Sequence, residues 1–470
     1  MMRLIFTYEW ISFKRNSFHG IMLFILAIFS VYAILYGKAV TDKQNEVLRQ
    51  IENSRQEEYK AYKAGFTADT TITEGLQAYQ KSSNPAFAWR RHSFVAAIEP
   101  KPLASLSVGQ RDLQPYFYRL TGMSLYYQLF QNEIENPLKL LSGNFDLPFV
   151  IIYIFPLLII AFTYIILASE KELGILPLLR IQSKMTLKRL AMLKLFFYAC
   201  LITALALSFS ILGFIISGLP DLTSMFQWCM TVFAYISFWL ALMFLIISFR
   251  KSTIFNAIAG LSTWLLFLVI APALLNISLS LNHTVDDTQL AGTVRRLALE
   301  NEQDEQEAIS VIHEYLQKKP SLKVEEVSLK KNLIAKAYAS FGQLNDMKHK
   351  EMADAYENKI KLRNELAQNF DFINPSVSAM NTFSMIARTD FHTYTNFRKS
   401  LMPFHQKIVD FYHEKLFYNK TIEESDYAAL PQFSLHENFD HNMAIYKNIA
   451  ILLLTALIIF MTGLWTSKRE

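Results

Sequence analysis

The chain has 470 residues, of which 52% are hydrophobic and only 19% are charged. Soluble proteins carry about 25% charged residues, and here long apolar runs alternate with stretches as polar as a soluble helix bundle. This pattern excludes a single soluble domain and also a compact protein buried entirely in the membrane. The net charge of +5 is mild and its basic residues are spread along the chain, so no nucleic-acid partner is indicated.

Six apolar runs are long enough to cross a bilayer, which takes about 20 residues. No small-residue cleavage site follows the first run at Tyr36, so we expect an uncleaved span rather than a signal peptide. The expected spans are residues 18–36, 148–168, 195–217, 225–249, 254–277 and 448–465.

The lysines and arginines of the short loops all fall on one side of these spans. They lie in residues 1–17, in the loop 169–194, at residues 250–251 and in the tail 466–470, whereas the loop 218–224 has none. The positive-inside rule therefore places both termini in the cytoplasm. We expect a mainly α, six-helix polytopic membrane protein. Its polar bulk would be a large, mostly helical extracytoplasmic domain built from two long loops, residues 37–147 and 278–447.

The first outer loop begins with a charged helical stretch that continues the first span and then becomes looser. The second outer loop has helical spacing of its apolar residues and breaks at Asn374-Pro375, so few or no strands are expected there. The expected outer helices are 41–63, 284–319, 327–370 and 394–418.

Motifs for chemistry are missing from the chain. The sequence contains no G-x-x-x-x-G-K-[ST], G-x-S-x-G, H-E-x-x-H or C-x-x-C. Both cysteines, Cys200 and Cys229, lie in apolar runs, which excludes a disulfide framework in the outer loops. The expected spans contain no acidic or basic residue, which disfavours a proton- or ion-coupled carrier, although Pro156 and Pro272 could kink two of them. We therefore expect no enzyme activity in this chain.

Histidines are concentrated in the second outer loop. They could form a metal site, or they could be solvated side chains on helix surfaces. Their spacings match no standard ligand pattern, so we expect neither a metal nor another cofactor in this chain. These histidines are His283, His313, His349, His392, His405, His413, His436 and His441.

Two cytoplasmic segments have amphipathic character. Residues 2–15 mix apolar and charged side chains and favour a helix lying in the membrane interface, the alternative being an ordinary flank of the first span. The loop 169–194 carries the apolar patch 175–179 between charged residues. Such a segment can dock into a groove of a partner, the alternative being a loop that merely obeys the positive-inside rule.

Together these features resemble an ABC-2 type permease, the membrane subunit of an ATP-binding-cassette transporter. The stretch 169–176 is similar to the acidic E-x-E-x-G-T-L segment of that family, with Ile175 at the threonine position. More narrowly, the chain resembles a subgroup with two large outer loops, often labelled a multicopper-enzyme-maturation-type permease, whose outer region is a domain of unknown function. Arg388 stands where the subgroup pattern has glycine. The matching outer residues are Pro102, Gly109, Gln110, Asn136, Pro137, Asp146, Thr389 and Asp390.

The resemblance, together with the absence of cysteines from the outer loops, implies a location in the bacterial inner membrane. It also implies a set of partners and residue roles. A cytoplasmic ABC ATPase subunit would bind ATP and Mg²⁺, and a second permease subunit, identical or paralogous, would complete the transporter in the lipid bilayer. The residues at the ATPase-coupling surface would be Glu9, Trp10, Glu170, Lys171, Glu172 and Gly174. The substrate is unknown.

The matching outer residues have two possible roles. They could pack the two outer loops against each other, or they could form a cargo site. Asp146 would cap the outer end of the second span. The alternative to a transporter is a non-transporting assembly platform, in which ATPase-driven motion of the spans acts on an envelope protein through the outer domain.

Overall fold

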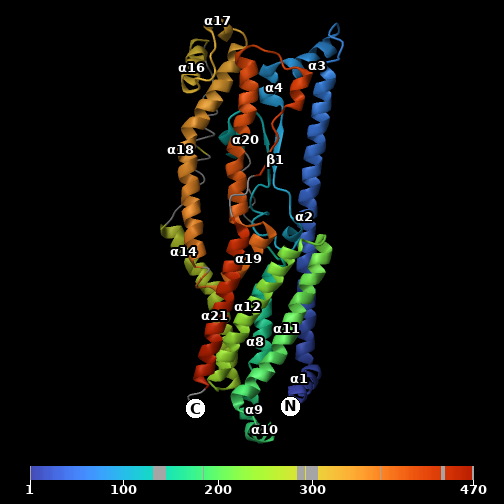
Figure 1. Ribbon diagram of the computed structural model, residues 1–470, viewed down its shortest axis with the longest axis vertical. Helices are drawn as coiled ribbons and strands as arrows, with labels where there is room; N and C mark the ends of the chain where they lie inside the picture. The colour runs from blue at the N-terminus through green and yellow to red at the C-terminus, as the bar shows by residue number, and fades with distance from the viewer. Residues whose placement is uncertain are drawn as a thin grey trace.

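The computed structural model describes residues 2–130, 144–183, 185–282, 292, 305–370, 372–435 and 440–467. It is an elongated, mainly helical molecule with a bundle of apolar helices at one end and a region of mixed composition at the other (Figure 1). Both chain ends lie at the free end of the bundle, beside α9 and α10 (Figure 1). We call this end the terminal end, and the opposite part of the molecule the distal region.

Six helices are long and apolar enough to cross a membrane, and each of the six expected spans falls on one of them. The central helix is α12, which packs against α8, α11, α13, α19 and α21. The helices of the bundle and terminal end are α1 (Met2–Arg15), α2 (Ser17–Gly65), α7 (Leu147–Phe149), α8 (Phe155–Thr163), α9 (Ala168–Glu172), α10 (Leu176–Ser183), α11 (Leu187–Ser217), α12 (Leu222–Ser248), α13 (Thr253–Leu265), α14 (Ala271–Asn282), α19 (Pro375–Ala387) and α21 (His441–Thr466).

Short polar side chains set the beginnings of these helices. Asp221, Ser252 and Asp440 each accept a hydrogen bond from a backbone N–H of the first turn of α12, α13 and α21, respectively. Such caps satisfy amides that have no partner within the helix, and each contributes about 1 kcal/mol. The short loops between the apolar runs thus fix where the spans begin.

Two of the spans contain a π-helical segment just before a proline. Residues Val150–Ile154 precede Pro156, and residues Leu266–Ile270 precede Pro272. Proline has no N–H to donate to the preceding turn, so carbonyls there lose their helical partner. Side chains from other helices replace it: the Tyr235 hydroxyl donates to the Ile152 carbonyl (2.9 Å), and Asn374 Nδ2 donates to the Phe267 carbonyl (2.7 Å).

The helix α19, which belongs to the expected outer loop 278–447, packs into the bundle of apolar helices. Its residues Phe383 and Ile386 belong to the same hydrophobic core as the spans, and the rings of Trp228 and Phe383 lie 4.5 Å apart. The Ser376 hydroxyl at its first turn hydrogen-bonds with Tyr235, near the middle of α12 (3.2 Å). Because α19 is apolar and capped by Asn374 at its N-terminus, it can pack into the bundle without exposing unpaired amides.

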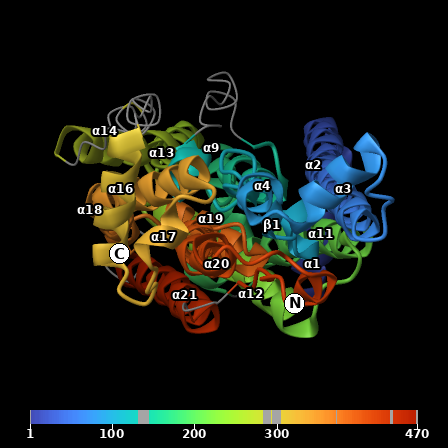
Figure 2. The ribbon, with the colours of Figure 1, turned by 90° about the horizontal axis from the view of Figure 1, so that it is seen from above.

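The distal region has its own hydrophobic core, centred on α20. Seen from above, α20 lies between α16 and α18 on one side and α2 and α3 on the other (Figure 2). Its elements are α3 (Thr73–Ser83), α4 (Pro85–Arg91), α5 (Leu125–Phe130), α16 (Glu305–Lys318), α17 (Glu326–Leu329), α18 (Leu333–Asn369), α20 (Phe391–Phe417), and an antiparallel pair of strands, β1 (Phe94–Ala97) and β2 (Phe117–Leu120), in which Phe94 pairs with Leu120.

Both strands belong to the first outer loop, and the described residues 305–435 contain none, as the sequence predicted. The expected helix 284–319 is described only from Glu305 onward. The expected helix 327–370 is divided at Asn332, which adopts a left-handed conformation (φ 57°) between α17 and α18.

The two regions are joined by α2, which runs without a break for 49 residues, about 73 Å, from the terminal end into the distal region. Gly37 lies where α2 passes the turn Pro102–Ser105, and a Cβ atom there would come within 1.9 Å of the Ser105 carbonyl oxygen. The absence of a side chain at this position therefore allows the two segments to touch.

Candidate functional site

The terminal end contains a buried ionic cluster formed by Glu9 of α1, Glu170 of α9 and Lys194 of α11. All three side chains are buried, the most exposed residue being Glu170 at 8%. Lys194 Nζ lies 2.9 Å from Glu9 Oε1 and also donates to Glu170 Oε1. The hydroxyl of Tyr198, one turn along α11, donates to Glu9 Oε2 (3.3 Å). One lysine thus joins two acidic residues that lie 161 positions apart in the sequence.

The sequence predicted that Glu9 and Glu170 lie at one surface, and the structure brings them together. It did not predict Lys194, which was grouped with the basic loop 169–194. Lys194 instead lies inside α11, and its spacing of four residues from both Leu190 and Tyr198 places it on the buried face of that helix. That spacing is the signal from which the sequence could have identified it.

The other predicted coupling residues lie next to the cluster without joining it. Lys171 Nζ donates to the Arg250 carbonyl (2.8 Å), and the Glu172 carboxylate accepts from the backbone N–H of Thr253 (2.8 Å) and from its hydroxyl. Glu172 therefore places its negative charge at the N-terminus of α13, where the helix dipole favours it. The segment α9 is thereby tied to α1, α11 and α13.

Trp10 and Gly174 occupy the border of this arrangement. Trp10 is 42% exposed, stacks on Phe13 and lies under Lys14 Nζ. Gly174 has φ +71°, and no atom lies within 4 Å of where its Cβ would be, so this turn needs the glycine for its backbone conformation alone.

The helix α10 projects from the terminal end (Figure 1) and presents apolar side chains to its surroundings. Leu178 is 60% exposed and Ile181 is 73% exposed. The helix is only eight residues long and is flanked by charged segments, so it is too short to cross a membrane. An exposed apolar surface of this kind indicates a contact with another protein or with the membrane interface.

A second set of predicted residues meets where the bundle joins the distal region. We call this place the junction; it is formed by residues 106–112, 144–147 and 388–393 and by His441. The Gln110 N–H donates to the Thr389 carbonyl (3.0 Å), and the Leu147 N–H donates to the Leu106 carbonyl (3.1 Å). Pro102 is the first residue of the short 3₁₀ helix that leads into these contacts.

Gly109 allows the closest approach at the junction. Its φ of +55° is in the left-handed region, and a Cβ there would lie 2.4 Å from Thr389 Oγ1. Its carbonyl accepts from Asn144 Nδ2 (2.9 Å). Both the backbone conformation and the lack of space therefore require glycine at this position.

Asp146 is the N-cap of the second span and is fully buried. Its carboxylate accepts from the backbone N–H of Phe149 and of Val108, each at 3.0 Å. Burial raises the pKa of Asp146 to about 7, although these amide hydrogen bonds oppose the shift. Asp146 thus holds the loop 106–110 against the start of the span.

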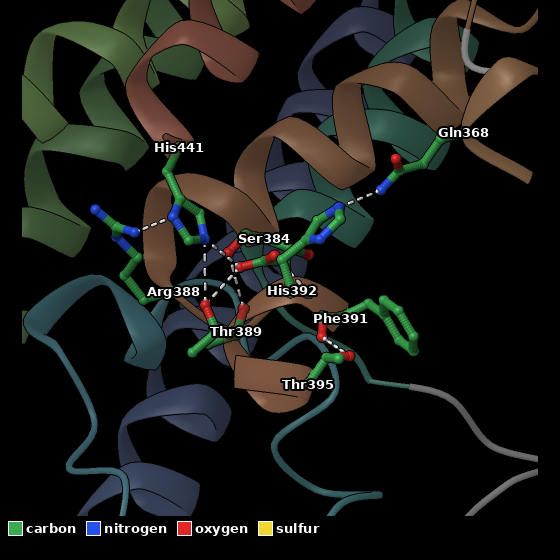
Figure 3. A network of polar contacts seen from close by, with 10 residues as sticks. Gln368, Ser384, Arg388, Thr389, Phe391, His392, Thr395 and His441 are labelled. Atoms are coloured by element: carbon green, nitrogen blue, oxygen red, sulfur yellow. Dashed lines mark hydrogen bonds and ion pairs between the residues drawn. The ribbon is translucent and has the colours of Figure 1, made fainter. Parts of the chain in front are cut away.

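Asp390 is the centre of a polar network, and Figure 3 shows its neighbours Arg388, His392 and His441. Its carboxylate accepts from the Thr393 hydroxyl (2.8 Å), the His392 N–H (2.9 Å) and His441 Nε2 (3.2 Å). Arg388 donates to His441 Nδ1, so the ring proton is on Nε2 and points to Asp390. Burial raises the pKa of Asp390, but the hydrogen bonds from His441 and Thr393 oppose this shift, and that pKa lies below its ordinary value. The network fastens α20 to the first turn of α21.

Arg388 stands where glycine was expected from the sequence. The backbone conformation of Arg388 explains why glycine would suit this position. It ends α19 in a left-handed conformation, with φ 57° and ψ 41°. Glycine adopts this conformation at helix C-termini without strain. In this chain arginine adopts it, and its side chain gains the contact with His441.

A cavity of about 420 Å³ lies between the junction, α18, α19 and the start of the second span. Its wall includes the predicted residues Gly109, Gln110, Asp146 and Asp390. Among the described residues no lysine or arginine lines it, whereas two aspartates and several amides do. Asn144 Oδ1 is buried there without a hydrogen-bond partner among the described residues. The cavity is therefore suited to a polar, uncharged or cationic molecule. The predicted residues Asn136 and Pro137 lie outside the described residues.

Several histidines of the distal region are buried in its core rather than solvated on helix surfaces. His92 Nδ1 pairs with the Tyr412 hydroxyl (3.1 Å), His413 Nδ1 pairs with the Tyr315 hydroxyl (2.8 Å), and His405 Nε2 donates to the Met123 carbonyl (2.7 Å). Within the described residues, no group of three or more histidine, cysteine or acidic residues is arranged to hold a metal. His283 and His436 lie outside the described residues.

We expect acidification to loosen the distal core. Burial lowers the pKa of His92 and His405 to about 4 and of His413 to about 3. A histidine with a lowered pKa contributes stability that is complete above pH 6.5 and is lost as the pH falls toward the folded-state value, about 2 kcal/mol for each at pH 5. Burial raises the pKa of Asp346 to about 6. Protonation of Asp346 therefore stabilises the folded chain as the pH falls, but by less than each histidine destabilises it.

The measurement is amide hydrogen exchange of α20 in the full chain at pH 7 and pH 5, corrected for the intrinsic rate. His413→Gln keeps a polar partner for Tyr315 and should remove part of the loss. Equal protection of α20 at both pH values would show that these histidines are not held neutral by burial.

Comparison with known families gives one match. Residues 288–436 match the model of a domain of unknown function, DUF3526, which covers less than half of the chain. This stretch includes α18, α19, α20 and the junction residues Thr389 and Asp390. No curated protein and no solved structure matches the chain.

Proposed function

We propose that this chain is the membrane-spanning permease subunit of an ABC-2 type transporter of the bacterial inner membrane. A separate cytoplasmic ATPase subunit binds and hydrolyses ATP with Mg²⁺, and a second permease subunit, identical or paralogous, completes the pathway. The chain itself has no catalytic role and couples the motion of the ATPase to the movement of a substrate.

The observation that carries this proposal is the set of contacts that connect the helices of the terminal end. Lys194 joins α1, α9 and α11 through Glu9 and Glu170, and Glu172 joins α9 to α13. A force applied to α9 and α10 therefore reaches α1, α11 and α13 through buried or capping contacts. The exposed apolar residues Leu178 and Ile181 supply the surface to which the ATPase binds.

The orientation of the proposed permease rests on the same end of the molecule. The chain ends and α9–α10 lie together there (Figure 1), and the basic short loops of the sequence belong to the same end. By the positive-inside rule this end faces the cytoplasm. The distal region and the junction cavity then lie on the outer side, where the cavity is a candidate position for the substrate.

A single surface substitution tests the proposal. We expect Ile181→Glu to abolish copurification of a P-loop ATPase with the tagged full-length chain in mild detergent, because a charge on α10 cannot enter an apolar groove. The matched control is Ile334→Glu on α18, whose isoleucine is 70% exposed and lies in the distal region. Wild type and I334E should retain the ATPase in stoichiometric amount. Absence of an ATPase from the wild-type preparation would refute the proposal.

The alternative is a non-transporting platform that acts mechanically on an envelope protein. The specific observation in its favour is α2, because one unbroken helix of 49 residues connects the terminal end to the distal region. Reconstituted vesicles separate the two functions: a transporter moves a substrate when ATP is supplied, whereas a platform hydrolyses ATP and releases or binds an outer partner without flux.

A further inference from the structure

A second cavity, of about 560 Å³, lies at the terminal end between the end of the second span, the C-terminus of α12 and the N-terminus of α13. We call it the rim cavity. Residues 249–252 connect two spans and form one of its edges, so the cavity is at the boundary between membrane and water. It lies apart from the junction and shares no lining residue with the junction cavity.

The rim cavity is positively charged. Lys171, Arg250 and Lys251 line it, and none of its lining residues in the described part of the chain is acidic. Glu172, which follows Lys171 in the chain, is engaged with Thr253 at the start of α13. Three cationic side chains therefore lie along the wall of this cavity. Arg250 is held in place by a left-handed backbone (φ 50°) and by its contact with the Ser467 carbonyl.

The same cavity has an apolar wall and one buried polar group. Leu167, Ile247 and Phe249 line the wall, and Phe249 is 48% exposed. Asn256, one helical turn beyond Ser252, is 1% exposed; its Nδ2 donates to the Tyr164 carbonyl (3.0 Å), whereas its Oδ1 is buried without a partner among the described residues. An acceptor left unpaired at a buried site is unfavourable unless a ligand supplies a donor.

We infer that the rim cavity binds an anionic phospholipid, with its phosphate among Lys171, Arg250 and Lys251, a headgroup hydroxyl toward Asn256 Oδ1 and the beginning of its acyl chains against Leu167, Ile247 and Phe249. Basic pockets between spans at the membrane surface recognise lipid headgroups in this way. The apolar wall distinguishes a lipid from free phosphate, and the unpaired acceptor favours a headgroup that carries a hydroxyl, such as that of phosphatidylglycerol.

The test is native mass spectrometry of the delipidated full-length chain titrated with phosphatidylglycerol, with phosphatidylcholine as the neutral comparison. Each cation near a phosphate contributes about fivefold in affinity, so K171Q/K251Q should bind phosphatidylglycerol about 30-fold more weakly. The single variant K251Q, which leaves the Lys171 contact with Arg250 intact, should lose about fivefold. K14Q/K188Q removes the same charge at the same end of the bundle and should bind like wild type.

Three results would overturn the inference. Equal binding of phosphatidylglycerol by K171Q/K251Q and K14Q/K188Q would place the lipid elsewhere. Equal binding of phosphatidylcholine by the wild-type chain would show that the charges are not used. Displacement of the lipid by an equal concentration of inorganic phosphate would assign the cavity to free phosphate instead. The chain is measured alone, so the outcome does not depend on an ATPase partner.

Discussion

Replacing Lys194 with methionine should lower the free energy of unfolding by about 3–5 kcal/mol. The substitution keeps the length of the side chain but leaves Glu9 and Glu170 buried, 5% and 8% exposed, without the cation that joins them. Removing one member of a buried ionic group is strongly destabilising because the remaining charges stay out of water. The measurement is SDS-induced unfolding of the full chain in mixed micelles.

Two further variants show whether the loss comes from uncompensated charge. Lys188→Met changes the same residue type six positions earlier on α11, outside the cluster, and should change stability by less than about 0.5 kcal/mol. The triple variant E9Q/E170Q/K194M carries no buried charge and should recover most of the stability. If K194M and K188M unfold at the same SDS fraction, the cluster does not hold α1, α9 and α11 together.

The substitution Gly109→Ala should be the most disruptive single-methyl change at the junction, with an expected loss of about 3 kcal/mol. The new Cβ would lie 2.4 Å from Thr389 Oγ1 and 2.7 Å from the Thr389 carbonyl oxygen, so the backbone of the loop 106–112 or of residues 388–390 must move. Hydrogen exchange should rise at residues 388–393, because the Gln110 contact with Thr389 and the contacts around Asp390 depend on this approach.

Gly174→Ala is the matched control. Gly174 also has a positive φ, +71°, but its Cβ would meet no atom within 4 Å. The G174A variant should therefore lose only the cost of placing alanine in a left-handed conformation, about 1 kcal/mol of the free energy of unfolding. A G109A variant no less stable than G174A would mean that the loop and Thr389 are not in close contact.

The sequence was sufficient for the elements that depend on local pattern. The six spans follow from runs of apolar residues, and the helix at residues 2–15 follows from its amphipathic spacing. The two-stranded sheet and the division of the helix at Asn332 are details that local propensity does not determine. The sequence marked only a break at Asn374-Pro375 and did not predict helix α19, whose packing against α12 and α21 is a tertiary property.

For the candidate sites, the sequence supplied most residues but not their partners. Glu9 and Glu170 could be grouped only through a resemblance, because nothing local relates residues 161 positions apart. Lys194 was not singled out because the neighbouring residues of the loop 169–194 are also basic. Gly109 and Thr389 were predicted to belong to one outer motif, but the reason, a backbone approach that excludes a Cβ, is a tertiary property.

The central claim is that α10 is the contact between this chain and an ATPase, and in-cell photocrosslinking measures it most directly. A photoreactive amino acid at Ile181 should give a covalent product with a P-loop ATPase, identified by mass spectrometry, whereas the same probe at Ile334 should not. Crosslinks from position 181 to lipid alone, or to an envelope protein with no ATPase, would contradict the account.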